Sequence, residues 1–266
     1  MSTEESASAP APGALLLCRA APDSVAAVAP LLGERMPLVR AGEEWSALVP
    51  AGGPWRDGGE PVDRVVTGWA AALAVGVPWP VLALWWDADR AGYALASGFR
   101  RPVGYVWLAG GTPAGEDEAM RTFAARLGLD PVLDLASLDR LTRPDPGADA
   151  RARVRGLLAV LTRAGVRLPA GLDPGDPADR LRERAGALPG TRWTAGTRWR
   201  DTASLAVRPP GEYGPGGRAL ALAQVAAGVP LMAWGARHRS GGWTTVGALL
   251  TAHGAPALVR PAPRRA

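Results

Sequence analysis

Short apolar runs alternate with stretches rich in glycine, proline and charged residues along the first half of the chain. These runs, each five or six residues long, occupy residues 14–18, 45–49, 81–86, 93–97 and 103–108. Apolar runs of this length, bounded by turn residues, predict strands. Only short Asp/Gly and Arg/Pro turns separate the last three runs, so we expect them to form an antiparallel meander.

Helical patterns lie between and after these runs. We expect helices at residues 62–75, 148–164 and 178–187, the first of them ending at Gly76. A further helix should begin with Thr112 as its cap and Pro113 in its first position, and end before Gly128. Strands and helices in this mixture predict an α+β, or mixed α/β, fold.

One order of elements occurs twice along the chain. In the first copy, a strand at 46–49 is followed by a Gly/Pro loop, an Ala-rich helix, the sequence Gly76-Val77-Pro78 and two strands. The second copy begins at 204–207 and passes through Gly228-Val229-Pro230 in the same order. We therefore predict two related lobes, each a small, mostly antiparallel sheet covered by helices, with internal duplication as their origin. Chance similarity between Ala-rich segments is the alternative explanation.

Charge divides the chain into two parts. Residues 1–150 hold 12 Arg against 19 acidic residues, whereas residues 151–266 hold 18 Arg against 6 acidic residues. Pro, Asp and Gly crowd at residues 144–147, directly before the composition turns basic. The expected organisation is a disordered tail at 1–13, an acidic N-terminal lobe at 14–144, a helical connector at 145–190 and a basic C-terminal lobe at 191–266. Because the two parts can neutralise each other or self-associate, nucleic acid is a less favoured partner despite the net charge of +5.

Composition excludes several kinds of chemistry. All 30 basic residues are arginine, a bias that, with abundant Ala, Gly and Pro, is typical of GC-rich actinobacterial coding. Without lysine there is no Walker phosphate loop and no Schiff base with pyridoxal phosphate. A single cysteine, Cys18, and two histidines cannot form an internal disulfide or the usual closed zinc site. We expect Cys18 to be a buried apolar residue, and we expect no cofactor.

A stretch of 22 residues, 65–86, carries no charge and is long enough to span a membrane. Pro78 and Pro80 divide it into a helix and a short strand, so we expect no membrane span. The first residues, with Glu4 and Glu5, lack the apolar stretch of a signal peptide. The sequence thus favours a soluble, cytoplasmic protein.

Asp87 and Asp89 are the candidate metal-binding and catalytic residues. An Asp-x-Asp directly after an apolar strand resembles the pair with which nucleotide-sugar glycosyltransferases hold a divalent cation against a diphosphate. The structural alternative, which we favour, is a hairpin turn between two strands.

Tryptophan and arginine supply the candidate contact residues. Trp85 and Trp86 are adjacent in a predicted strand, so they point to opposite faces and one indole is available to a partner. The sequence Thr-Arg-Trp occurs at 191–193 and again at 197–199, where Arg stacked on Trp could seat a phosphate or simply pack within a hairpin. The candidate ligand or partner contacts are Trp85, Trp86, Trp193, Arg198, Trp199 and Arg218, the last beside a Gly-rich loop that precedes a helix.

The sequence shows no catalytic nucleophile, no set of metal ligands and no cofactor-binding loop. These features favour a non-catalytic binding protein. Its partner would be another protein or a second copy of itself. The alternative is a metal-dependent enzyme that acts on an anionic or sugar-nucleotide substrate through Asp87 and Asp89.

Overall fold

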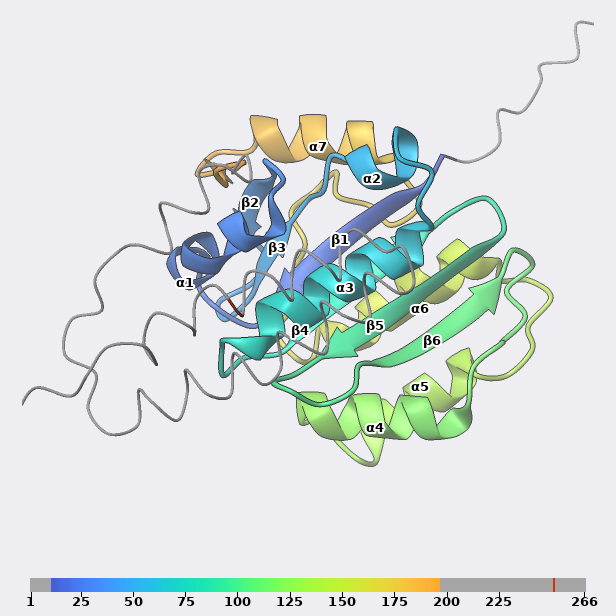
Figure 1. Cartoon of the computed structure of the whole chain (residues 1–266). Coiled ribbons are helices and arrows are strands. Elements are labelled where there is room, and N and C mark those ends of the chain that lie inside the picture. Colours follow the sequence, from blue (N-terminus) through green and yellow to red (C-terminus); the bar gives the residue numbers. More distant parts are fainter. Residues whose placement is uncertain (1–10, 197–250, 252–266) are drawn as a thin grey trace, which may run out of the picture. The chain divides into compact units, whose positions relative to one another are not determined.

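A computed structural model describes residues 11–196 and residue 251. The described strands form one antiparallel sheet in the order β6-β5-β4-β1-β3-β2-β7. Its strands are β1 (Gly13–Cys18), β2 (Pro37–Arg40), β3 (Ser46–Leu48), β4 (Val81–Trp86), β5 (Arg90–Ala96), β6 (Val103–Leu108) and β7 (Arg192–Trp193). The helices are α1 (Pro22–Val28), the 3-10 helix η1 (Ala29–Leu32), α2 (Gly53–Arg56), α3 (Val62–Val75), α4 (Asp117–Leu127), α5 (Leu133–Leu141), α6 (Ala150–Leu161) and α7 (Ala178–Ala187). Figure 1 shows their arrangement.

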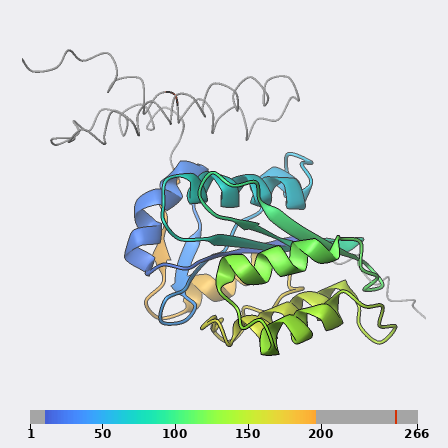
Figure 2. The same cartoon turned by 90° about the horizontal axis from the view of Figure 1, so that it is seen from below.

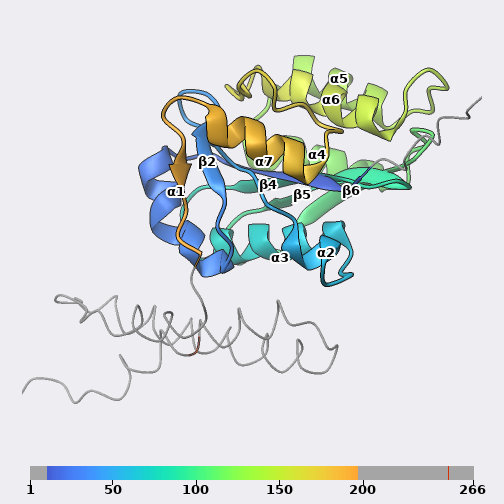
Figure 3. The ribbon, with the colours of Figure 1, turned by 90° about the horizontal axis from the view of Figure 1, so that it is seen from above.

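Helices cover both faces of the sheet, and this explains why β1 is apolar at every position. Leu15 and Leu17 belong to the core on the face covered by α4, α5 and α6, whereas Leu16 and Cys18 belong to the core on the face covered by α1 and α3. Successive side chains of a strand point to opposite faces, so a strand with both faces covered needs no polar position. Figure 3 shows the sheet edge-on between the two helical layers, with α2 and α3 on one side and α5 and α6 on the other.

The mixed α+β fold expected from the sequence is confirmed. The antiparallel meander lies at the predicted residues. Val81 of β4 pairs with Ala96 of β5, and Leu95 of β5 pairs with Val103 of β6. Helix α3 has the predicted bounds and is followed by Gly76. Cys18 is fully buried, as expected.

The expected start of the fourth helix is wrong. Helix α4 begins at Asp117, with Glu116 as its cap residue. The segment from Thr112 instead runs back along β6, where the Leu108 N–H donates to the Thr112 carbonyl at 2.9 Å and the Ala114 N–H donates to the Val106 carbonyl at 2.9 Å. An edge strand has backbone N–H and C=O groups without partners in the sheet. Residues 112–114 bond to these groups of β6, so they cannot form the first turn of the helix.

Helices α6 and α7, from the segment expected to act as a connector, pack against the sheet through Leu157 and Leu181. The β7 strand that follows α7 pairs with β2. The expected basic lobe and the second copy of the repeated pattern lie almost wholly outside the described residues, so the lobes and their duplication stay predictions. In the described part of the chain, no helix is both long enough and apolar enough to cross a membrane.

Candidate functional site

The short edge strand β7 is fixed to the sheet by the residue that follows it. Thr194 is buried, and its N–H donates to the Met36 carbonyl at 2.9 Å. Its hydroxyl accepts the Met36 N–H at 2.9 Å and donates to the Glu34 carbonyl at 3.2 Å. These bonds hold the backbone beside Trp193 in place although β7 has only two residues.

Trp193 is 40% exposed, and two arginines stack on it, Arg35 from the loop before β2 and Arg182 from α7. The Arg35 guanidinium carbon lies 4.9 Å from the ring centroid, and that of Arg182 lies 5.3 Å from it. Both distances fall within the range of about 6 Å in which the ring quadrupole attracts a cation. Gly186 of α7 lies against the same ring, since a Cβ at this position would come within 2.9 Å of Trp193 Cζ2.

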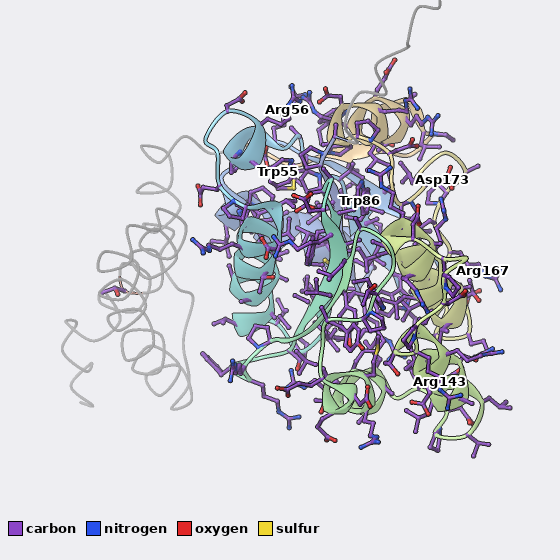
Figure 4. All side chains as sticks on the ribbon, turned by 90° about the vertical axis from the view of Figure 1, so that its right-hand side faces the viewer. Trp55, Arg56, Trp86, Arg143, Arg167 and Asp173 are labelled. Carbon is purple, nitrogen blue, oxygen red and sulfur yellow. The ribbon has the colours of Figure 1, made fainter. Side chains whose placement is uncertain are left out.

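An open hollow of about 640 Å³ extends from this ring along α7 to α2. Its polar lining comes from Arg56, Asp179, Arg182 and Glu183. Arg56 and Asp179 form an ion pair that joins the two helices. Figure 4 shows Arg56 at the surface between α2 and α7, with Trp55 turned toward the interior.

Glu34 lies beneath this surface. Its Oε1 accepts the Gly53 N–H at 3.2 Å, and its Oε2 is buried without a hydrogen-bond partner among the described residues. Burial raises the pKa of Glu34, while the hydrogen bond from Gly53 and the charge of Arg182 act in the opposite direction. The indole N–H of Trp55 is likewise buried without a partner in the described part of the molecule.

We call Arg35, Arg182 and Trp193, with the hollow beside them, the Trp193 site. Neither Arg35 nor Arg182 forms an ion pair with another described residue, whereas Arg192, the direct neighbour of Trp193, is paired with Asp23. Planar guanidinium groups bind carboxylates through two parallel hydrogen bonds and still stack on aromatic faces. The Trp193 site can therefore hold a carboxylate and an apolar side chain next to each other.

Of the predicted contact residues, Trp193 is the one placed at this surface. Trp85 and Trp86 point to opposite faces as expected, but both rings are buried, so neither is available to a partner. The Arg90 guanidinium carbon lies 5.3 Å from the Trp85 ring centroid, and the Trp86 indole N–H donates to the Asp176 carbonyl at 2.9 Å. Figure 4 shows Trp86 inside the molecule. Because helices cover both faces of the sheet, these two residues belong to the core.

Asp87 and Asp89 lie in the turn between β4 and β5. Asp87 Oδ1 accepts the N–H groups of Asp89 at 2.9 Å and Arg90 at 2.7 Å, and Asp87 Oδ2 lies 3.8 Å from the Arg90 guanidinium. The carboxylate thus stabilises the hairpin turn. Among the described residues, no three His, Cys, Asp or Glu side chains gather closely enough to hold a metal ion.

Arg198, Trp199 and Arg218 lie outside the described residues. The sequence analysis missed Arg35 and Arg182, the two arginines that stack on Trp193. Arg182 had a signal, because it lies on a helix that the pattern predicts and precedes Trp193 by only 11 residues. Arg35 had none, because only the pairing of β2 with β7 brings it to the ring.

Comparisons of the chain with protein-family models, with curated proteins and with solved structures found no match.

Proposed function

We propose that the chain is a non-catalytic binding protein whose Trp193 site contacts a protein partner. One observation carries the proposal: Trp193, 40% exposed on an anchored edge strand, is held by two arginines that form no ion pair with the described residues. Tryptophan and arginine are the residue types most enriched where protein interfaces gain most of their binding energy. The partner chemistry that fits is a segment with a carboxylate beside an apolar side chain, on another protein or on a second copy of this chain.

The alternative predicted from the sequence, a metal-dependent enzyme using Asp87 and Asp89, has no specific observation in its favour. One oxygen of Asp87 already accepts two backbone N–H groups, and the other faces Arg90. We therefore propose the binding function alone.

Native mass spectrometry of the full chain, purified gently from its own host, tests this function. The wild-type protein should carry the mass of a second polypeptide, and Trp193→Ala should remove that mass. Leu108→Ala is the matched control, because Leu108 is similarly exposed, at 45%, but lies on β6 at the opposite edge of the sheet. A bare wild-type chain, or equal loss of the partner from both variants, contradicts the proposal.

A further inference from the structure

Among the described residues, the most exposed large hydrophobic side chains lie where β5 leads into β6 and where α5 begins, away from the Trp193 site. Phe99 is 61% exposed in the turn between β5 and β6, and Val132 and Leu133, at the start of α5, are 73% and 66% exposed. Figure 1 shows that β5 and α4 end on the same side of the molecule, at its lower left. Figure 2 shows the same relation from below, with α4 beneath the meander.

Two contacts join these parts into one surface. The Arg126 guanidinium, near the end of α4, donates to the Arg101 carbonyl of the turn at 2.9 Å. A hollow of about 350 Å³ is lined by both Leu127 and Leu133, so the end of α4 and the start of α5 lie side by side. We call Phe99, Arg100, Arg101 and Arg126, together with Val132 and Leu133, the basic end.

The three arginines of the basic end carry charge that the described residues do not neutralise. Arg100 and Arg101 are exposed, and none of the three forms an ion pair with another described residue. Burial, and then the nearby charge of Arg100, lowers the pKa of Arg126.

Two of the acidic side chains near this end have cationic partners, whereas the exposed carboxylate of Asp130 accepts the N–H groups of Val132 and Leu133 and forms no ion pair with another described residue. Asp134 pairs with Arg163, and its Oδ2 accepts the Asp130 N–H at 2.8 Å. Glu44 pairs with Arg19 at 3.2 Å. Three arginines without ion pairs outnumber the single carboxylate of Asp130, so the basic end keeps a net positive charge that favours an anionic partner.

The side chains of the basic end indicate which anionic partner fits. Phe99 lies in the turn after β5, whereas Val132 and Leu133 lie at the start of α5. The three side chains therefore protrude separately and do not form one groove. Nucleic acids are bound by stacking bases on aromatic rings, yet two of these three side chains are aliphatic. The apolar boundary of a bilayer accepts aromatic and aliphatic side chains alike, and its anionic headgroups attract arginine.

We propose that the basic end docks peripherally on a bilayer that contains anionic phospholipid. Phe99, Val132 and Leu133 enter the boundary between headgroups and acyl chains, and Arg100, Arg101 and Arg126 contact the lipid phosphates. This surface is separate from the Trp193 site, so either proposal can fail without the other.

A fluorescent probe at single positions tests the docking and its orientation. Cys18 is fully buried, so a thiol-reactive, polarity-sensitive dye should label Phe99→Cys, or Leu108→Cys at the opposite end of β6, and leave Cys18 unlabelled. With vesicles of phosphatidylcholine and phosphatidylglycerol, the dye at position 99 should brighten and shift to the blue, while the dye at position 108 should not change. Vesicles of phosphatidylcholine alone should change neither. A response at position 108 alone, at neither position, or to a single-stranded oligonucleotide in place of vesicles overturns the proposal.

Charge reversal separates this surface from the general basic charge of the chain. Each arginine close to an anionic bilayer contributes about fivefold in binding, so Arg100→Glu/Arg101→Glu should weaken vesicle co-sedimentation at least ~10-fold. Arg64→Glu/Arg155→Glu changes the net charge equally at two exposed positions elsewhere and should bind as the wild type does. Equal losses in the two double variants would show that net charge, and not the basic end, governs binding.

Discussion

Substitution by alanine should lower the stability of the protein very differently at two glycines that have the same backbone conformation. Gly111 and Gly128 have φ angles of 76° and 66°, in the left-handed region that L-residues disfavour by about 1–2 kcal/mol. A Cβ at Gly128 would meet nothing within 4 Å. At Gly111 it would lie 1.7 Å from the carbonyl oxygen of Ala148, far closer than the 3.0 Å that real Cβ atoms respect.

The clash at Gly111 involves backbone on both sides, so no side chain can move to relieve it. The shift would strain the Ala150 N–H bond to the Ala109 carbonyl at 3.1 Å and the Gly111 N–H bond to the Leu108 carbonyl at 2.7 Å. A buried backbone group that loses its partner costs about 1–3 kcal/mol. With one of these hydrogen bonds lost, we expect Gly111→Ala to lower the free energy of unfolding by about 2–5 kcal/mol, against about 1–2 kcal/mol for Gly128→Ala.

Equilibrium unfolding of the full chain in urea, followed by circular dichroism, measures both changes. Gly128→Ala is the matched control, because it has the same φ cost without the clash. If the two variants lose equal stability, the close approach of the 109–111 turn to the start of α6 is wrong.

Three further predictions follow from buried polar groups. Thr194→Val leaves the buried Met36 N–H without its side-chain acceptor, so it should lower the free energy of unfolding by about 1–3 kcal/mol. An unchanged midpoint of urea unfolding would refute that role of Thr194. Glu34 has a raised pKa, so its ionisation opposes folding. Glu34→Gln should therefore have a higher free energy of unfolding than the wild type at neutral pH, and this difference should shrink as the pH falls toward 4.5. A difference that does not change with pH would contradict the raised pKa. Burial also raises the pKa of the Cys18 thiol, so a thiol reagent should react with it only after denaturation, and rapid reaction of the native protein would speak against its burial.

Much of the sheet could be predicted from the sequence because its central strands are buried on both faces. A strand such as β4, apolar at all six positions, gives a strong signal. Strand β2 was missed because Pro37 and Arg40 flank only two apolar residues. Helix α5 was missed although a signal was present: Asp130 Oδ1 accepts the N–H groups of Val132 and Leu133, as expected of an aspartate that begins a helix.

The candidate site could be predicted only in part, for a different reason. Trp193 stood out because Thr-Arg-Trp is repeated, but its sequence neighbour Arg192 pairs with Asp23 and does not stack on the ring. The arginines that do so come from the loop before β2 and from α7. The pairing of β2 with β7 brings Arg35 to the ring, whereas Arg182 precedes Trp193 by only 11 residues in the chain. Local pattern identified the aromatic ring and the helix that carries Arg182, whereas Arg35 reaches the ring only through a contact between distant segments.

Photo-crosslinking in the host cell tests the central claim most directly. A photoreactive phenylalanine at Ala187, an exposed residue that lines the hollow beside Trp193, should join the chain to a specific polypeptide. The same group at Leu108 should not, and Trp193→Ala should abolish the crosslink from position 187. A crosslink that survives Trp193→Ala, or that forms only from position 108, would contradict a protein-binding role for the Trp193 site.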